Sequence, residues 1–449
     1  MTTKELLSRI KDGQIDTIQV AAPDMLGRLV GKRFTGDCFA RQLVEGATHG
    51  CNYLFAVDIA MEPQDGYALA NWEAGFGDFE FRPDFNAIFP IPWEGASALV
   101  FCDFHHHGGN LVEQAPRTIL RRQMERLAAR GMRAAMASEL EFFLFNEDYD
   151  AAARLGYSDL TPASSYRIDY HMLQTGREEP LIREIRNQML AAGLPIENSK
   201  GEWGVGQHEI NMTYADDPML MADRHVVFKH GAKHIAQSHG KSITFMAKPR
   251  RGDAGSSCHI HLSLFQSEGN AFWDKTNASG SELFRQFLGG LIKYCRELTL
   301  FFAPTINSYK RFEAMSWAPT KQVWATDNRT TAFRVVGRGS GFRIENRMPG
   351  ADANPYLAFA AMIAAGIAGI DEKLDCGTEY HGNAYVDAAL SNVPANLREA
   401  AQFFGGSELA RRSFGVEVVE HYAHAANLEL RQFEAAVTDW ERKRYFEQI

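Results

Sequence analysis

The chain has 449 residues, enough for two domains, and 45% hydrophobic with 23% charged residues is the composition of a folded globular protein. Its formal net charge of −9 disfavours binding to nucleic acid or to an anionic membrane, because both require a basic surface. Six widely spaced cysteines without a C-x-x-C pair indicate reduced thiols in a cytoplasmic protein. The longest apolar run, 356–370, is shorter than the ~20 residues that span a bilayer, so we expect a buried helix there.

The first part of the chain is predicted to be rich in strands. A short helix and three strands are expected, in order, at 4–12, 17–22, 26–34 and 98–102, with a hairpin turn at 24–27. The stretch 105–110 holds three consecutive histidines and two glycines. We interpret it as a solvated loop rather than a metal site, and place a domain boundary there. The predicted domains are 1–108 and 109–449.

The second part alternates strands with helices and ends in helices. Strands are predicted at 132–145, 206–214, 243–247, 257–265, 332–336 and 342–347. Helices are predicted at 117–130, 180–192, 218–239, 281–297, 354–373, 396–403, 416–424 and 428–445. This order predicts an α+β fold, with a small N-terminal β-rich domain and a larger domain of strands followed by helices.

Charged side chains recur at alternate positions of the predicted strands. Glu139 and Glu141 are two residues apart, so they share one strand face while apolar neighbours bury the other. Taken alone, this pair also fits a solvated polar face. The pattern then returns in three further places, which makes that simpler interpretation less favoured. These places hold Glu202 and Glu209, then His259, His261 and Ser263, and then Arg343, Glu345 and Arg347.

The charges point to phosphoryl transfer. Five of these residues are glutamates, and two hard divalent cations would offset most of their charge. A set of carboxylates with one imidazole suits Mg²⁺ or Mn²⁺ better than Zn²⁺. Arginine forks bind phosphates and carboxylates in a bidentate manner, and metals with arginines are typical of phosphoryl-transfer sites. The candidate arginines are Arg311, Arg329, Arg334, Arg343 and Arg347.

At this point the sequence resembles the glutamine synthetase family. The segments that carry the resemblance, in order, are S-E-L-E-F-F-L-F (138–145), G-Q-H-E-I-N (206–211), M-A-K-P (246–249), G-S-S-C-H-I-H-L-S (255–263), N-S-Y-K-R-F (307–312), D-N-R-T (327–330), R-I-E-N-R (343–347) and N-P-Y-L-A-F-A-A (354–361). The resemblance implies an N-terminal β-grasp domain and a catalytic domain with a curved antiparallel sheet. It also implies a homo-oligomer, a double hexameric ring (dodecamer) with active sites between subunits.

The resemblance also implies roles for single residues. ATP and glutamate would be the substrates, with two or more Mg²⁺ or Mn²⁺ ions in each active site. One metal would be held by Glu141, Glu202 and Glu209, and the other by Glu139, His259 and Glu345. Arg329, Arg334 and Arg343 would face the phosphates, while Glu197, Tyr214, His261 and Ser263 would border the nucleotide. Glutamate would be bound by Arg311, Arg347, Gly255 and His259.

One departure from the family pattern concerns the second nitrogen substrate. Ammonia-using members carry a glutamate where this chain has Trp317, and their Asp-Gly-Ser-Ser motif is replaced by a stretch containing Asp58. An indole is apolar and cannot accept a proton. The change resembles the subgroup that makes γ-glutamylamides from organic amines, with Asp58 as a candidate proton acceptor. Two alternatives remain: a glutamine synthetase in which Trp317 only packs in the core, and a catalytically silent structural or regulatory relative.

Overall fold

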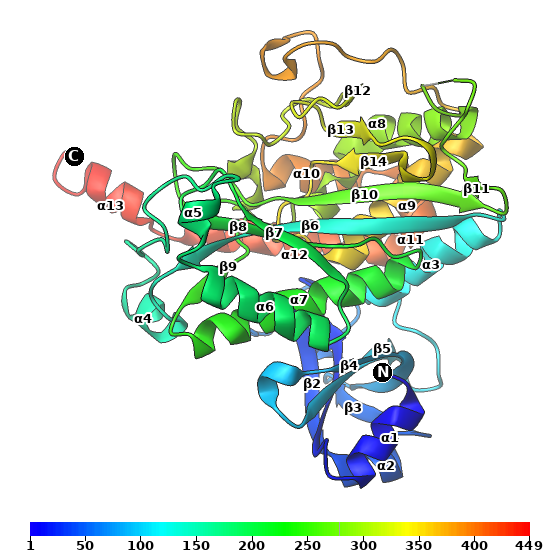
Figure 1. The fold of residues 1–449 in the computed structure, drawn as a ribbon, viewed down its shortest axis with the longest axis vertical. Coiled ribbons are helices and arrows are strands. Elements are labelled where there is room, and N and C mark those ends of the chain that lie inside the picture. Colours follow the sequence, from blue (N-terminus) through cyan, green and yellow to red (C-terminus); the bar gives the residue numbers. More distant parts are fainter. Residues whose placement is uncertain (278) are drawn as a thin grey trace.

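The computed structural model describes residues 1–277 and 279–449. In the N-terminal part a five-stranded sheet has the order β2-β1-β5-β4-β3, in which β1 and β5 run parallel and the other neighbours antiparallel. The strands are β1 Thr17–Pro23, β2 Leu29–Thr35, β3 Thr48–Cys51, β4 Asp78–Pro90 and β5 Ser97–His105. Helices α1 Thr3–Lys11 and α2 Gly36–Gln42 and the short turns η1 Asn52–Phe55 and η2 Pro92–Glu94 complete this part (Figure 1).

The predicted hairpin between β1 and β2 is confirmed. Asp24 holds the turn with one carboxylate oxygen, which accepts hydrogen bonds from the backbone N–H groups of Leu26 and Arg28, both at 2.9 Å. Gly27 follows with a φ of +80°, a conformation that favours glycine. The turn also contacts the larger part of the chain, because the Asn354 side chain donates a hydrogen bond to the backbone oxygen of Met25 at 3.0 Å.

The larger sheet carries the strands on which the predicted charged residues alternate. Its main path is β12-β13-β14-β10-β6-β8-β7, with β11 beside β10 and β9 beside β6, and every pair is antiparallel except β12–β13. The strands are β6 Arg133–Phe145, β7 Ile196–Gly201, β8 Gln207–Met212, β9 Ser242–Thr244, β10 Cys258–Gln266, β11 Gly269–Asn270, β12 Trp324–Thr326, β13 Phe333–Val336 and β14 Arg343–Asn346.

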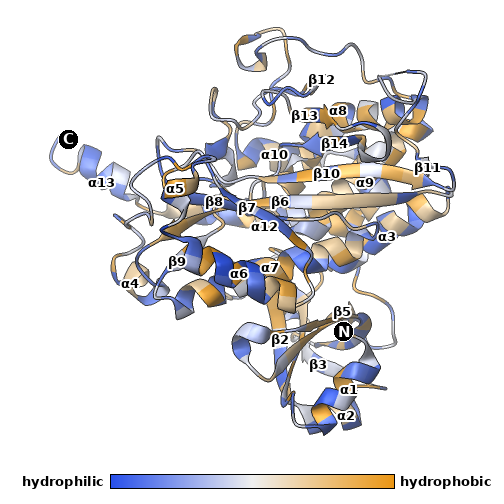
Figure 2. Cartoon of the chain, in the orientation of Figure 1, coloured by the Kyte–Doolittle hydropathy of each residue, from blue (hydrophilic) through white to orange (hydrophobic). Residues whose placement is uncertain are grey.

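Helices cover the other face of this sheet and separate it from the N-terminal part (Figure 1). The helices of this part of the chain are α3 Pro116–Ala128, α4 Tyr149–Arg154, α5 Met172–Thr175, α6 Glu179–Ala191, α7 Pro218–Ser238, α8 Glu282–Phe302, α9 Pro355–Asp371, α10 Leu397–Gly405, α11 Glu408–Phe414, α12 Val416–Ala435 and α13 Asp439–Tyr445. Figure 2 shows hydrophobic residues along β10 and hydrophilic ones on α13, which projects from the body.

The expected buried helix over 356–370 is α9, whose residues 355–369 are all buried. It packs closely on α8, because an added Cβ at Gly290 would lie only 2.1 Å from the backbone oxygen of Ala365. No helix among the described residues is both long and apolar enough to cross a membrane.

Two expectations about elements need correction. The helix expected at 428–445 is divided: α12 runs without a break through 416–435, and α13 begins anew after Thr438, which forms a capping box with Glu441. The second correction is an omission, since strand β4 was not predicted. Pro83 and Pro90 interrupt its alternation of apolar and polar residues, and its pairing register with β5 shifts between Pro83 and Ile88.

Candidate functional site

The predicted site residues form a row across the larger sheet. In adjacent strands Arg334 pairs with Glu345, Glu345 with His261, His259 with Glu139, Glu139 with Asn211, and Glu141 and Lys200 each with Glu209. The row borders a cavity of about 680 Å³. Its lining includes Glu139, Glu141, Glu202, Glu209, Gly255, His259, Arg311, Trp317, Arg329, Arg334 and Arg347.

The first carboxylate group consists of Glu141, Glu202 and Glu209, which offer oxygens within 4.8 Å of one another. The Glu141 carboxylate is oriented by the side-chain amide of Gln207, at 3.0 Å, and by the backbone N–H of Ser257, at 2.8 Å. Lys200 forms an ion pair with Glu202. Neighbouring residues therefore fix the positions of Glu141 and Glu202 through these contacts.

Electrostatics in this group favour a bound cation. Burial raises the pKa of Glu141 to about 7, and the Glu202 carboxylate adds to the shift. Burial also raises the pKa of Glu209 well above its usual value, with further repulsion from Glu202, Glu139 and Glu141. Three crowded carboxylates that resist ionisation are the donor set that a hard divalent cation stabilises.

The second group consists of Glu139, His261 and Glu345, again within 4.8 Å of one another. The predicted ligand was His259, and its Nδ1 does lie 3.1 Å from Glu139 and 3.4 Å from Glu345. The structure adds His261, whose Nε2 is 2.7 Å from Glu139 and whose Nδ1 accepts a hydrogen bond from Arg343. His261, expected beside the nucleotide, thus lies among the candidate metal ligands, because positions i and i+2 of β10 share a face.

Positive charge balances this second group. Burial would raise the pKa of Glu345, but the Arg347 guanidinium, with Nη1 2.5 Å from the carboxylate, outweighs it and lowers that pKa to about 2. Arg334 approaches the other oxygen of Glu345 at 2.9 Å. Burial lowers the pKa of His259 to about 4, and Arg347 adds to the shift, so the imidazole is neutral and free to bind a metal.

Arg311 and Arg347 close one end of the cavity. Arg311 is buried and donates to the backbone oxygens of Met348 and Arg347, at 2.9 and 2.8 Å. Gly255 permits this arrangement, because an added Cβ would lie 2.7 Å from Cγ of Arg311. Among the described residues, Nε of Arg347 has no hydrogen-bond partner although it is buried. An unpaired guanidinium donor beside the cavity suits an anionic substrate group.

Trp317 lies in the cavity and not in the core. The residue is 47% exposed, and its ring centroid is 5.9 Å from that of Trp203, at an interplanar angle of 67°. Its φ is +68°, a strained conformation for a bulky residue, and its carbonyl accepts a hydrogen bond from Arg347 at 3.2 Å. Trp203 and Trp317 thus form an aromatic part of the wall of a largely charged cavity, and the backbone of Trp317 is held in place there.

Seven predicted residues are not part of the lining of this cavity. Three of them, His261, Arg343 and Glu345, belong to the second group all the same, through contacts with Glu139, His261 and Arg334 respectively. The other four lie apart from it. Asp58 borders a separate cavity and caps its own turn, accepting from the backbone of Ala60 and from Gln64 and Gln432 side chains. Glu197 and Tyr214 are exposed near the β7 end of the sheet. Ser263 is buried and donates to the backbone oxygen of Phe342 at 2.7 Å, so its hydroxyl already has a partner. Ser263 shares the strand face of His259 and His261 because of the alternation along β10, but it lies two residues beyond His261 and outside the cavity.

The sequence reasoning missed several residues of the cavity. Lys200 and Asn198 come from β7, which was not predicted, and Asn211 stands two positions after Glu209. Asp169 and Tyr170 come from a loop, where Asp169 lies 3.1 Å from Lys200 and the Lys200 ammonium lies over the Tyr170 ring at 4.2 Å. The period-2 pattern that continues past Glu209 could have indicated Asn211, whereas the loop residues carry no periodic signal.

Comparisons with known proteins bear on the family of this chain. Residues 113–445 match the family model described as the glutamine synthetase catalytic domain. The chain is 48% identical to the γ-glutamylethanolamide synthetase GlnA4 of Streptomyces coelicolor, over 99% of this chain and 96% of that one. It is 37% identical to the glutamate–isopropylamine ligase of a Pseudomonas species, over 98% of this chain and 97% of that one.

A solved structure described as a GmaS–ADP complex superposes with a TM-score of 0.85 at 30% identity, over 99% of this chain and 100% of that one. The match therefore extends to the N-terminal part as well as to the sheet that bears the site. With the family model covering most of the chain and relatives aligned along nearly all of it, this chain belongs to the glutamine synthetase family.

Proposed function

We propose that this chain is an ATP-dependent ligase that joins the side-chain carboxylate of glutamate to a small organic amine. The observation that carries the proposal is the row of metal-type carboxylates and arginines that ends at an exposed tryptophan pair in one cavity. The family uses ATP and divalent metals, and the two relatives with the higher identities are named for amide synthesis from amines.

Two divalent cations fit the donor groups. Glu141, Glu202 and Glu209 would hold one, and Glu139 and Glu345, with His259 and His261 beside them, would hold the other. Bound there, Mg²⁺ or Mn²⁺ would supply charge neutralisation for ATP phosphates and for a reacting carboxylate. Arg334 and Arg329 line the same cavity, where their guanidinium groups would bind phosphate oxygens.

The chemistry needs an activated acyl group, because a carboxylate does not react with an amine. The γ-phosphoryl group of ATP passes to the side-chain carboxylate of glutamate, which gives γ-glutamyl phosphate and ADP. The deprotonated amine then attacks the acyl carbon, the C–O bond to phosphate breaks, and the amide and inorganic phosphate leave. Arg347, with its unpaired Nε, and Arg311 would hold the carboxylates of glutamate at one end of the cavity.

The amine would bind at Trp317 and Trp203. An ammonium ion is strongly hydrated, so a site that selects it needs anionic or hydrogen-bonding groups in place of its water. An indole face instead covers an alkyl substituent, gaining roughly 25 cal/mol per Å² of apolar area, and attracts a cationic amine before its proton leaves. The fixed backbone of Trp317 keeps that face directed at the cavity.

The remaining parts of the proposal concern the whole protein. We place a β-grasp domain at 1–108 and the catalytic domain at 109–449, and we expect a double hexameric ring in the cytoplasm, where six free cysteines are typical. All residues that line the active cavity lie between Glu139 and Arg347. Asp58 does not line the active cavity of its own chain, so in a ring with sites between subunits we propose that Asp58 of a neighbouring copy reaches the amine.

The test is the rate of phosphate release with glutamate, ATP and Mg²⁺, measured as kcat/KM for ammonia, methylamine, isopropylamine, ethanolamine, putrescine and aniline. We expect an organic amine to exceed ammonia by at least about tenfold in the wild type, which corresponds to about 1.4 kcal/mol. Trp317→Glu should shift the preference toward ammonia, whereas the control Trp317→Phe, which keeps an aromatic face, should not. If ammonia is the best substrate of the wild type, the protein is a glutamine synthetase and the proposal is wrong.

A further inference from the structure

A second group of possible metal ligands lies where the N-terminal part meets α7. His230 and His234 are four residues apart on α7, so both imidazoles point to the same side of the helix. Glu94, at the end of η2, faces them: its Oε1 is 3.7 Å from Nε2 of His230 and 3.8 Å from Nε2 of His234. These residues do not line the catalytic cavity.

The Glu94 carboxylate is held so that one oxygen is left for the histidines. Its Oε2 accepts a hydrogen bond from the Gln19 side chain at 2.6 Å and lies 3.5 Å from Nη2 of Arg33. The turn that carries Glu94 is fixed as well, because Trp93 packs on α7 at Gly231, where an added Cβ would lie 2.7 Å from the indole ring. Outer contacts of this kind orient ligands in metal sites.

Two of the three facing atoms lack a partner. Oε1 of Glu94 and Nε2 of His230 are buried, and neither makes a hydrogen bond with any described residue. Polar atoms in such positions are expensive to leave unsatisfied. They are too far apart, at 3.7 Å, to satisfy each other, but both could bind one ion placed between them.

The spacing agrees with a four-coordinate transition metal. Ligands placed about 2.1 Å from a tetrahedral zinc ion are about 3.4 Å apart, slightly less than the separations of 3.7 and 3.8 Å found here. Two imidazoles and one carboxylate are a zinc-type donor set with a fourth position left for water. The catalytic groups differ, since they are richer in carboxylates and suit Mg²⁺ or Mn²⁺.

We propose that Glu94, His230 and His234 form a Zn²⁺ site that joins the N-terminal part to the catalytic part. The ion would connect η2, between two strands of the first sheet, to the middle of α7, which packs under the second sheet. His234 is 43% exposed, so the site is reachable from solvent. A cross-link at this place would stabilise the contact between the two parts without entering the reaction.

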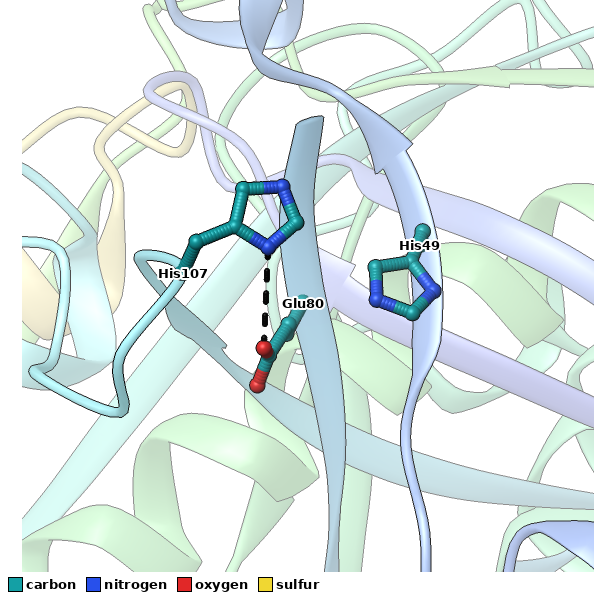
Figure 3. A group of neighbouring side chains, drawn as sticks. All are labelled: His49, Glu80 and His107. Carbon is teal, nitrogen blue, oxygen red and sulfur yellow. Dashed lines mark ion pairs between the residues drawn. The ribbon is translucent and has the colours of Figure 1, made fainter. Parts of the chain in front are cut away.

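A similar group on the first sheet provides a control. Figure 3 shows His49 of β3 and His107 of the loop after β5 on either side of Glu80. His107 lies 3.7 Å from Glu80, but both histidines are exposed, their rings stack at 5.7 Å, and Arg82 pairs with the carboxylate. No atom of this group is among the buried unpartnered atoms of the described residues. We therefore expect it to bind Zn²⁺ weakly.

The experiment uses the full chain, stripped of metal by a chelator and then saturated with Mg²⁺ so that the carboxylate groups are occupied. Zn²⁺ is titrated against a competing chelator, and the melting temperature is recorded with and without it. We compare the wild type with Glu94→Gln, with the double variant His230→Asn and His234→Asn, and with the control double variant His49→Asn and His107→Asn.

The wild type and the His49/His107 control should bind one Zn²⁺ more than the His230/His234 variant and show a larger rise in melting temperature. Glu94→Gln, which keeps the shape of the side chain, should weaken Zn²⁺ binding by about 100-fold, and Gln19→Ala by about tenfold. Co²⁺ bound in place of Zn²⁺ should show the visible absorption of a four-coordinate ion only where the site is intact. Equal Zn²⁺ stoichiometry and affinity in all variants, or loss only in the His49/His107 control, would overturn the proposal.

Discussion

The two carboxylate groups of the active cavity are neighbours on one sheet but differ in electrostatics. Around Glu345 the arginines and histidines compensate the negative charge, and the pKa of this carboxyl is lowered to about 2. Around Glu209 the neighbours are other carboxylates, and its pKa is raised well above the usual range. One group is thus nearly neutral without metal, while the other remains under repulsion until a cation binds.

This difference separates two uses of charge in one site. The Glu345 group is a network of ion pairs with Arg334 and Arg347, so removing one member leaves its partners unpaired. The Glu209 group is destabilised in the metal-free protein, and this stored repulsion favours binding of a cation. Substitutions in the two groups should therefore have opposite effects on stability, although both should lower activity.

The largest effect is expected from Glu141→Gln. The loss of one carboxylate from the crowded group should lower kcat by on the order of 10³-fold, because bound metal would neutralise charge in the transition state. The same change should raise the melting temperature of the metal-free protein at pH 8, since it removes repulsion. Phosphate release and thermal unfolding of one preparation measure both effects. A variant that is inactive and also less stable without metal would contradict the comparison.

Glu345→Gln should destabilise the fold instead. Arg347 and Arg334 would lose their shared buried carboxylate, and breaking such a pair costs about 3–5 kcal/mol of unfolding free energy. Denaturant unfolding of the metal-free protein measures the loss, with Glu209→Gln from the other group as the matched control. If both variants lose equal stability, the two groups are not different in the way described.

Arg334→Ala should slow ADP formation by on the order of 10²-fold, the amount typical of one lost charge-stabilising donor. Single-turnover measurements with labelled ATP isolate this step. Arg334→Lys retains the charge but cannot contact Glu345 and Asp327 together as the guanidinium does, so it should recover only part of the rate. Wild-type turnover in a folded Arg334→Ala protein would show that Arg334 has no role in phosphoryl transfer.

The smallest effect is on the pH dependence of stability. Glu141 has its pKa raised to about 7 in the fold, so between about pH 4.5 and 7 the native state binds more protons than the unfolded state, and stability falls as pH rises. The contribution is on the order of 1–3 kcal/mol. Buried His208 and His421, with pKa values lowered by burial to about 4 and 3, give the opposite slope, with stability rising through about pH 6.5.

The Glu141 contribution is therefore measured as the difference between wild type and Glu141→Gln. Without metal, the wild type should lose stability relative to the variant from pH 5 to 7.5. With Mg²⁺ the difference should shrink, and Mg²⁺ should stabilise the wild type more at pH 7.5 than at pH 5. Parallel pH profiles for the two proteins would show that Glu141 titrates normally.

Much of the site could be predicted because it lies on strands. Period-2 alternation placed Glu139 and Glu141, and then His259 and His261, on common faces without knowledge of the fold. The helices with long amphipathic or apolar patterns, such as α7 and α9, were found for the same reason. These signals are local, and the structure retains them.

The rest depended on contacts that no local pattern encodes. β4 was obscured by its prolines, and Asp169 reaches Lys200 from an irregular loop. Asp58 was predicted from the stretch that replaces a motif of the ammonia-using members, yet its carboxylate accepts hydrogen bonds from its own turn and from Gln432, far along the chain. The meeting of Glu94 with His230 also depends on how the two parts pack, which sequence spacing does not reveal.

The row of site residues also has a consequence for how the chain is made. β10 pairs with β6 so that Cys258 lies opposite Leu140, 118 residues earlier. At a synthesis rate of about 5–20 residues per second, one edge of β6 waits for its partner for on the order of 10 s. During that interval the apolar residues Ala134, Met136 and Leu140 have no strand on that side, and the nascent chain is open to aggregation. β6, which carries one member of each carboxylate group, is thus also a strand that stays partly unpaired during synthesis.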